Sequence, residues 1–465
     1  MSTVERVATL DTVWFQIEQA SSPMQLVGLM ITQTPVNRQQ LESQLQNCLL
    51  PLPRFSQRVL HDRVGAVWES CPVDMQQHLV STSLPPGAQH EALETLVGTL
   101  ATCPLDQGRP LWQFHLVEDY QGGSALIARI HQGLADAIAI TGLLRAMATA
   151  RDDTARPDNS GLRPEGLLDQ LYAPLTRAVI EGIKLSGAFW GRYWGLLFNP
   201  QRVFDYACAS TALALEISKL NSLPDDSASP LKGQASGYKR ASWSAPLPFA
   251  DISAVARAHQ TTIDAVILAA LAGAIHHCLG KEATARGSEL RTLMPVNLRN
   301  EASDDVLGNR SGLIPLELPI GLDAPDARLL EIDRRIRSFN DAYEAQRALG
   351  LFSLMGQTPR AVQLQTLKLL ASKTSALLYR VPAAPDPHTL CGARIIEEMY
   401  WSPAPGDLGV TMSIIDQGES CRIGVLADLA MLPDPSAITD RLGVELALLA
   451  PAKPQGQRRA RKRKP

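Results

Sequence analysis

The chain has few aromatic residues, no closely spaced cysteine pair and no long uninterrupted hydrophobic run. Aromatic residues make up only 5% of the 465 residues, which argues against a surface that stacks nucleic-acid bases. The 7 cysteines are odd in number and scattered, with no CxxC pair, so the sequence indicates neither a disulfide framework nor a zinc site. We therefore expect a reduced protein that binds no metal.

No segment has the composition of a membrane-spanning helix or of a secretory signal. The most apolar run, Ala265–Ile275, is flanked by Asp264 and His276, and it is shorter than the roughly 20 residues that cross a bilayer. The start of the chain carries Glu5 and no apolar stretch, unlike a signal peptide. These features predict a cytoplasmic protein in which the apolar run forms a buried helix.

Charge is divided unevenly along the chain. The net charge is -3, yet seven Lys and Arg residues and no acid follow Pro451, so the rest of the chain is strongly acidic. Basic residues near a membrane attract anionic lipid by roughly 1 kcal/mol each. The tail is therefore predicted to be a solvated end that favours anionic lipid, whereas the acidic body and scarce aromatics disfavour nucleic acid as a partner.

Length and composition predict two globular units. A chain of 465 residues with 45% hydrophobic and 20% charged residues suits two domains of roughly 200 residues each. Breaker-rich loops at Arg151–Pro164 and Ser222–Lys239 bracket a mostly helical segment with an aromatic cluster, Phe189–Phe198. That cluster suits packing between domains or, alternatively, an interfacial helix on lipid. The predicted divisions are a first domain over 1–150, a loop and helical connector over 151–235, a second domain over 236–450 and a disordered basic tail over 451–465.

Strand and helix patterns alternate in both predicted domains. Alternation over Pro110–Glu118, a turn at Gln121–Gly123 and an apolar run over Ser124–Ile130 predict a β-hairpin. Thr261–Asp264 resembles a capping box that opens a long buried helix ending near Gly280. Other expected elements are strands at Met24–Thr32, Arg291–Val296 and Leu313–Leu318, helices at Asn37–Leu49, from Asp136 to about Ala150 and from an Asp251 cap through His259, and a hairpin of Val410–Ile415 with Cys421–Ala427. The mixture predicts an α/β (α+β) fold with mixed sheets flanked by helices.

His131 lies where an apolar strand meets a helix, a position from which a histidine can act as a general base. Its unperturbed pKa of about 6.5 allows it to take a proton near neutral pH, although a lone histidine at a strand end is more often structural. Asp136 can cap the following helix or hold a neighbouring arginine. Structural roles are expected for three other candidates: His115 within a strand, the His276–His277 pair at a helix end, and Asp264 as a helix cap.

Ordered motifs run through both predicted domains. Pro104–Glu118 reads PLDQGRPLWQFHLVE, and His131–Ala137 reads HQGLADA. They resemble the PLD..RPLW...L.E block and the HHxxxDG motif of the bacterial wax ester synthase/acyl-CoA:diacylglycerol acyltransferase family, which follow one another at this distance. Further resemblances are Leu10–Phe15 with Pro23–Met24, Met294–Arg299 with Gly308–Arg310, and Ala427–Asp428 with Pro433–Asp434. The resemblance therefore extends over roughly Val7 to Leu449.

The resemblance implies two chloramphenicol-acetyltransferase-like domains that enclose a tunnel, with acyl-CoA entering from one side and an alcohol or diacylglycerol from the other. In the family, the second histidine of HHxxxDG deprotonates the hydroxyl that attacks the thioester, and nearby donors stabilise the oxyanion. An O-acyltransferase that makes triacylglycerol or wax ester is implied, with acyl-CoA as a substrate and no cofactor. We also expect a cytoplasmic protein peripheral to the inner membrane or lipid droplets.

The motif departs from the family at its central position. Asp136 sets the register, so that His131 matches the first histidine and Gln132 matches the second, although glutamine has no useful basicity. Either His131 takes over as base through a shifted loop, or Gln132 only orients the alcohol and the rate falls by about 10²–10⁴-fold, or the protein binds lipid without turnover. Another acceptor, as in the related condensation domains of peptide synthetases, is disfavoured because the chain has no carrier-protein module.

Three further departures surround the expected site. Ala137 replaces the glycine after the aspartate, Ile263 stands where the family has asparagine before Asp264, and the family's NVPG block reads Arg380–Ala383. The predicted catalytic residues are His131, Gln132 and Asp136. Residues predicted to bind substrate or support the site are Trp112, Asp264, Asn297, Asn309, Arg310 and Arg380, and no metal ligand is predicted.

Overall fold

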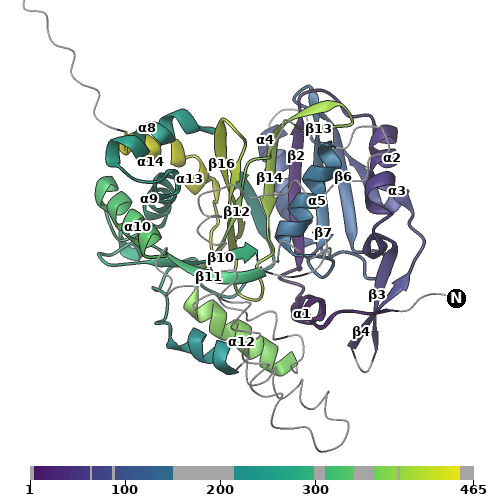
Figure 1. Cartoon of the computed structure of the whole chain (residues 1–465), viewed down its shortest axis with the longest axis horizontal. Helices are drawn as coiled ribbons and strands as arrows, with labels where there is room; N and C mark the ends of the chain where they lie inside the picture. Colours follow the sequence, from purple (N-terminus) through teal and green to yellow (C-terminus); the bar gives the residue numbers. More distant parts are fainter. Residues whose placement is uncertain are drawn as a thin grey trace, which may run out of the picture.

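The computed structural model describes residues 5–62, 65–85, 89–149, 214–297, 309, 311–339, 355, 360–384 and 388–450. The two halves of the chain lie side by side, each built around a β-sheet (Figure 1). Several predicted features lie outside the described residues: the loop Arg151–Pro164, the aromatic cluster Phe189–Phe198, Arg310 and the basic tail.

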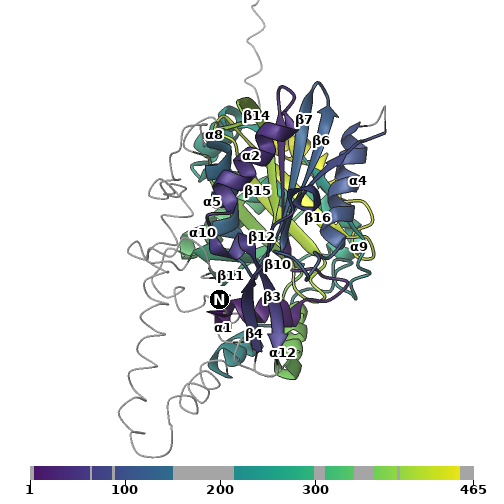
Figure 2. The ribbon, with the colours of Figure 1, turned by 90° about the vertical axis from the view of Figure 1, so that its right-hand side faces the viewer.

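A sheet of six strands forms the core of the N-terminal half. Its order is β13-β14-β2-β7-β6-β5, and Figure 2 shows helices α2 and α5 on one face and α4 on the other. The predicted hairpin is confirmed in β6 and β7, which turn through Gln121 and Gly122 with φ of 53° and 85°. The bounds are β2 Gln25–Thr32, β5 Leu79–Thr82, β6 Trp112–Tyr120, β7 Gly123–His131, β13 Thr389–Leu390, β14 Ala393–Trp401, α2 Arg38–Leu49, α4 Gln89–Thr102 and α5 Ala137–Thr149.

Strand β14 belongs to this sheet although it comes from the C-terminal part of the sequence. It pairs antiparallel with β2, with Trp401 opposite Val27. The predicted boundary at residues 235/236 therefore does not separate the two sheets. Strands β13 and β14 follow this boundary in the sequence but belong to the sheet of the N-terminal half. A sequence pattern predicts that a strand forms but not which edge it joins, because the pairing is set by distant residues.

A second sheet forms the core of the C-terminal half. Its order is β11-β10-β12-β15-β16-β8, with β9 paired to β16, and β12 runs parallel to β10 and β15. The predicted strands over Arg291–Val296 and Leu313–Leu318 and the second hairpin are confirmed. The bounds are β8 Lys239–Trp243, β9 Leu247–Pro248, β10 Leu290–Asn297, β11 Ser311–Leu318, β12 Ala376–Val381, β15 Val410–Asp416, β16 Ser420–Asp428, α8 Phe249–His259, α9 Ile263–Ala283, α10 Pro325–Phe339, α12 Arg360–Lys373, α13 Ser436–Thr439 and α14 Leu442–Leu448.

Helix α9 is the central helix of this half. Within the described residues it alone has the length and apolar composition of a membrane span, but 67% of its window Ile263–Gly280 is buried inside the protein. Its apolar side chains belong to the core between the sheet and α8, α10 and α14, so the predicted buried helix is confirmed. At Gly280 the backbone leaves helical geometry, with φ of 73°.

Two predicted helix caps are wrong. The Thr262 side chain, not Asp264, caps α9 by accepting the amide of Ala265 at 3.1 Å. Helix α8 begins at Phe249 after Pro248, so Asp251 lies in its first turn, where its charge still favours the helix dipole.

A small sheet and a short helix complete the N-terminal half. The sheet has the order β1-β4-β3, and helix α1 lies beside it near the junction with the C-terminal half (Figure 1). Their bounds are β1 Glu5–Arg6, β3 Gln57–Asp62, β4 Gly65–Ser70 and α1 Thr9–Ile17; η1 Pro53–Ser56 and α3 Met75–His78 are short turns of helix. Helix α1 brings Asp11, Trp14 and Phe15 to the motif that follows β7.

Candidate active site

His131 ends β7 and is buried, with a neighbour close to each of its ring nitrogens. Its Nδ1 accepts the amide of Gly133 at 2.9 Å, and its Nε2 lies 3.5 Å from Glu18 Oε1. The ring stacks on Phe15 with centroids 4.7 Å apart and planes 3° from parallel, and only 2% of the residue is exposed. Because the Nδ1 lone pair is already bound, a neutral ring carries its proton on Nε2, facing Glu18.

These contacts contradict the interpretation in which His131 takes over as base. The lone pair that would accept a proton is held by a backbone amide, and the ring does not line the pocket described below. Glu18 is matched to this arrangement: burial acts to raise its pKa, but the hydrogen bond and charge of His131 outweigh it and hold the pKa below its ordinary value. Glu18 and Phe15 were not predicted as site residues: Phe15 ends the Leu10–Phe15 motif, but nothing in the sequence marks it as a partner of His131, and Glu18 lies in none of the motifs.

The backbone around His131 is tightly packed. A Cβ atom added to Gly133 would lie 2.1 Å from Phe15 Cζ, a distance that no side chain can adopt, so glycine is required beside the stacked ring. Asp136 accepts the amide of Ala139 at 3.0 Å and thereby caps α5, which is one of the two roles predicted for it. Asp136 is 1% exposed, and a direct part in catalysis stays a prediction.

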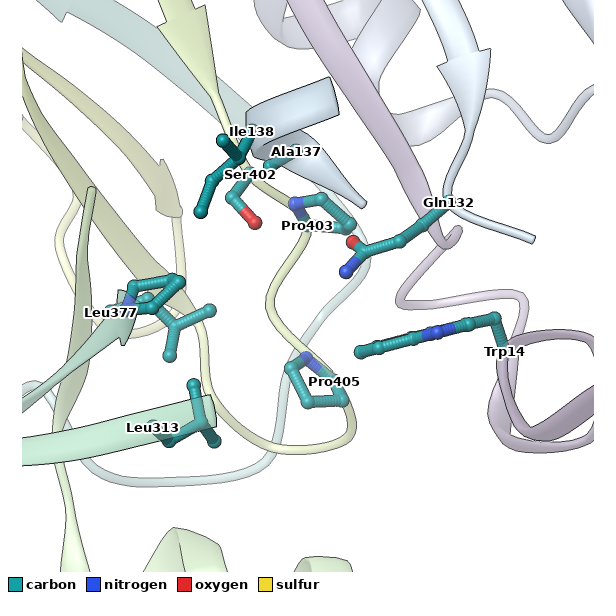
Figure 3. Close-up of a pocket in the computed structure, with 10 residues that line it drawn as sticks. Trp14, Gln132, Ala137, Ile138, Leu313, Leu377, Ser402, Pro403 and Pro405 are labelled. Carbon is teal, nitrogen blue, oxygen red and sulfur yellow. The ribbon is translucent and has the colours of Figure 1, made fainter. Parts of the chain in front are cut away.

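Gln132 lines a pocket between the two halves. Its backbone amide donates to Met24 O at 2.8 Å, and its carbonyl accepts from Asn309 Nδ2 at 2.8 Å. The side chain extends into the space between Trp14 and Pro403 (Figure 3). Gln132 is 5% exposed, and its Oε1 has no hydrogen-bond partner among the described residues.

The pocket is small, with a cavity volume of about 20 Å³, and is mainly apolar. Gln132 and Ser402 are the aliphatic polar side chains that face it, and Trp14 supplies an indole. None of the described residues that line it is an acid, histidine, lysine, arginine, cysteine or tyrosine. The lining residues are Trp14, Gln132, Ala137, Ile138, Pro295, Leu313, Leu377, Ser402, Pro403 and Pro405.

Asn309 connects the halves directly behind Gln132. Its Nδ2 donates both to the Gln132 carbonyl and to Asp11 Oδ1, each at 2.8 Å, and its backbone amide lies 3.3 Å from the same oxygen. Burial raises the pKa of Asp11 above its ordinary value, although the hydrogen bonds from Asn309 oppose the shift. Asn309 thus links Asp11 to the backbone of Gln132, and its part in binding substrate stays a prediction. Asp11 lies in the Leu10–Phe15 motif but was not predicted as a site residue.

Arg380 and Asp264 come together, but outside the pocket. Arg380 Nη1 lies 2.9 Å from Asp264 Oδ1, and its Nη2 lies 3.8 Å from Asp416 Oδ2. Along β12, Leu377 and Tyr379 face the N-terminal half, whereas Leu378 belongs to the core of the C-terminal half. Arg380 lies on the same face of β12 as Leu378. Its ion pair with Asp264 therefore supports the start of α9, and Arg380 does not line the pocket.

Trp112 lies apart from the pocket, and only the backbone pairing of Asn297 is described. Trp112 donates from Nε1 to Phe55 O at 2.9 Å and packs on the His78 ring at 4.1 Å. Asn297 ends β10 opposite Ser311. His115, expected to be structural, is buried with Nε2 3.1 Å from Gln113 Oε1, and burial beside Arg129 lowers its pKa to about 4.

His276 lies within α9 rather than at its end. Its Nδ1 is 2.7 Å from Ile320 O, and its Nε2 is 3.3 Å from Asp323 Oδ1. These contacts tie the helix to the loop after β11, in agreement with the structural role expected for it.

Comparison with known proteins gives matches over both halves. A model described as "wax ester synthase/diacylglycerol acyltransferase catalytic domain" matches residues 7–267, and one described as "WS/DGAT C-terminal domain" matches 307–450. "Probable diacyglycerol O-acyltransferase tgs1" of Mycobacterium tuberculosis strain H37Rv is 25% identical over 449 residues, covering 93% of this chain and 92% of the relative. "Probable diacyglycerol O-acyltransferase Tgs4" of strain CDC 1551 is 30% identical over 336 residues, covering 69% and 66%.

Solved structures share the fold. The wax ester synthase/diacylglycerol acyltransferase from Marinobacter aquaeolei VT8 has a TM-score of 0.66 at 19% identity, covering 96% of this chain and 98% of that one. The first condensation domain of the calcium-dependent antibiotic synthetase has a TM-score of 0.60 at 15% identity, covering 97% and 96%. The predicted fold of two chloramphenicol-acetyltransferase-like units is confirmed. Since the family's models match most of its residues, the chain belongs to the wax ester synthase/diacylglycerol acyltransferase family.

Proposed function

We propose that this protein is an O-acyltransferase that moves a fatty acyl group from acyl-CoA to diacylglycerol or a long-chain alcohol, making triacylglycerol or wax ester. The observation that carries the proposal is the position of Gln132. The residue that matches the family's second histidine lines the pocket between the halves, whereas the residue that matches the first is held behind it. Family membership supports the same reaction class.

Gln132 can orient the acceptor but cannot take its proton. A hydroxyl in the pocket would donate to the unpartnered Oε1 of Gln132, which fixes the oxygen for attack on the thioester carbonyl. As the C–O bond forms and the C–S bond breaks, the hydroxyl proton goes to solvent or to the departing CoA thiolate. Without a positioned base the rate is expected to be lower by about 10²–10⁴-fold.

Ser402 is the second aliphatic polar side chain in the pocket and is 4% exposed. Its hydroxyl and the Nε2 of Gln132 are both hydrogen-bond donors that can face the oxygen on which negative charge develops. A donor placed against such an oxyanion typically contributes about 10²–10³-fold to the rate. We assign this stabilising role to Ser402, which no sequence motif had marked.

The proposed reaction uses acyl-CoA as a substrate and needs no cofactor or metal, because the thioester itself supplies the leaving group. We propose a cytoplasmic location, peripheral to the inner membrane or lipid droplets. The lipid acceptors and the seven basic residues after Pro451 support this location, since basic residues favour anionic lipid surfaces. Acyl-CoA and the acceptor are the proposed partners, and nucleic acid is not one.

A lipid-binding or lipid-droplet protein without turnover is the second candidate. The observation that favours it is the absence of a titratable side chain among the described residues that line the pocket, together with the engagement of His131. Such a protein would hold acyl chains against Leu313, Leu377 and Ile138 but would release no CoA.

Incubation of the purified protein with palmitoyl-CoA and either hexadecanol or a diacylglycerol separates the two candidates. Free thiol reports CoA release, mass spectrometry identifies the ester, and heat-denatured protein gives the background. Ester formation above background supports the O-acyltransferase. Acyl-chain binding with no release across several chain lengths would refute it in favour of the lipid-binding candidate.

A further inference from the structure

The pocket combines a buried hydrogen-bond acceptor with a neutral lining. Gln132 Oε1 is buried and without a partner among the described residues, and no described lining residue can act as a general base near neutral pH. An unsatisfied buried oxygen costs about 1–3 kcal/mol, so a ligand that donates a hydrogen bond to it is favoured. The acceptor substrate is the ligand that would meet this oxygen.

The missing base affects nucleophiles unequally. An alcohol attacks poorly unless a base removes its proton, which is why hydroxyl nucleophiles are paired with a base in enzymes. A neutral primary amine already has a free lone pair and needs no proton removed before attack. Apolar surroundings lower the pKa of an amine by disfavouring its charged form, so a lining such as that of Leu313, Leu377 and Pro405 would hold an amine in its reactive state.

The hydrogen-bonding pattern also favours nitrogen over sulfur. A primary amine that uses its lone pair for attack retains two N–H groups, one of which can donate to Gln132 Oε1. A thiolate has no hydrogen to donate, its charge is disfavoured by the apolar lining, and the S–H of a neutral thiol is only a weak donor. Among nucleophiles that need no enzyme base, the amine therefore fits this pocket best.

We propose that the pocket also accepts long-chain primary amines and that the protein transfers the acyl group of acyl-CoA to them, forming a fatty amide. The inference rests on the proposed function, because it uses the same pocket and the same acyl donor. The amine nitrogen forms a bond to the thioester carbon, and the C–S bond breaks. The departing CoA thiolate takes the proton that the nitrogen loses, so the products are a neutral amide and CoA thiol.

Paired acceptors of equal chain length test the inference. Palmitoyl-CoA is supplied with hexadecylamine or hexadecanol, CoA release is followed as free thiol, and mass spectrometry identifies N-hexadecyl palmitamide or hexadecyl palmitate. Heat-denatured protein measures the spontaneous reaction of amine with thioester, which is subtracted. We expect kcat/KM for the amine to exceed that for the alcohol by about tenfold or more, since loss of a positioned base removes about 10²–10⁴-fold from hydroxyl attack.

Variants at Gln132 tie the preference to its side chain. Gln132→His introduces a base and is expected to shift the amine-to-alcohol ratio of kcat/KM toward alcohol by about tenfold or more. Gln132→Leu removes the acceptor oxygen and is expected to lower amide formation by about tenfold. Gln40→Leu, at an exposed position on α2, is the matched control and should leave both reactions unchanged. Circular dichroism of each variant verifies folding.

The outcomes distinguish the two proposals. Amide formation that depends on Gln132 supports the inference. Ester formation without amide refutes the inference and leaves the O-acyltransferase in place, whereas the lack of both products refutes the O-acyltransferase and the inference together. Amide formation that is equal in wild type and Gln132→Leu would also overturn the inference, because the oxygen would then have no part in it.

Discussion

Restoring a histidine at position 132 should change both the rate and the pH dependence of ester formation. In the wild-type protein, no titratable side chain lines the described part of the pocket, so none of the described lining residues can act as a base at neutral pH. Gln132→His would place an imidazole on the same Cβ, facing the same space between Trp14 and Pro403. Its Nε2 or Nδ1 could then take the proton of a bound hydroxyl.

The expected gain lies near the lower end of the range for general-base catalysis. A positioned base contributes about 10²–10⁴-fold to the rate. Because Gln132 Oε1 can already orient the hydroxyl, Gln132→His is expected to add only the contribution of proton transfer. We therefore expect kcat/KM for hexadecanol to rise about 10²-fold, equivalent to roughly 2.7 kcal/mol of activation free energy. Gln132→Asn, which keeps the amide and adds no base, should show no gain.

The pH profile provides a second, independent readout. A histidine base works only when neutral, so ester formation by Gln132→His should fall as pH drops through about 6.5, the unperturbed pKa of histidine. The wild-type rate should lack this step. CoA release measured from pH 5 to 8 gives both quantities, with ester confirmed by mass spectrometry. A folded Gln132→His protein whose rate and pH profile match wild type would refute the view that the missing base limits the reaction.

Three further predictions concern Ser402, His131 and Glu398, a buried carboxylate on β14 that pairs with Arg145 and His388. Ser402→Ala should lower kcat/KM for alcohol and amine acceptors alike, by about 10²-fold if its hydroxyl faces the oxyanion, and a change confined to one acceptor would exclude that role. His131→Ala should lower the free energy of unfolding by about 3 kcal/mol through loss of the ring stacked on Phe15, measured by urea denaturation; an unchanged midpoint would contradict a structural role. Burial acts to raise the pKa of Glu398, but His388 and Arg145 outweigh it and lower the pKa to about 2. Because the unfolded pKa is about 4.3, this carboxylate stabilises the fold fully above that pH. The stabilisation is lost as the pH falls toward 2. Glu398→Gln should flatten the dependence of stability on pH in this window, and equal slopes in variant and wild type would show that Glu398 is not its source.

Local signals predicted the elements that surround the site. The turn between β6 and β7, the helix after Asp136 and the buried helix α9 were all readable from patterns of neighbouring residues. Pairing of β14 with β2 was not, since it joins residues more than 360 positions apart in the sequence, such as Trp401 and Val27. A period-two pattern specifies which side chains share a face of a strand, but not which strand lies beside it.

The candidate site was predictable only as far as the motif register extended. Asp136 identified Gln132 as the residue at the family's second histidine, and the structure places Gln132 in the pocket. The role of His131 depends on its contacts with Phe15 in helix α1 and with Glu18 just after that helix. A histidine's role follows from what occupies its two nitrogens, and those partners lie outside the motif.

The four departures from the family's motifs separate into two groups once their positions are known. Asp264, beside the changed Ile263, pairs with Arg380 on the far side of β12, so the changes at 263 and 380 belong to the support of α9. Gln132 and Ala137, by contrast, both line the pocket. Ala137 adds a methyl group where the family has glycine, while its carbonyl accepts Tyr379 Oη–H at 2.9 Å and holds the start of α5 against β12. Compared with the family's motif, the pocket therefore carries an extra methyl group at Ala137 and a neutral amide in place of the basic imidazole at Gln132. Both changes favour an unbranched acceptor whose nucleophilic atom needs no base, such as a primary amine.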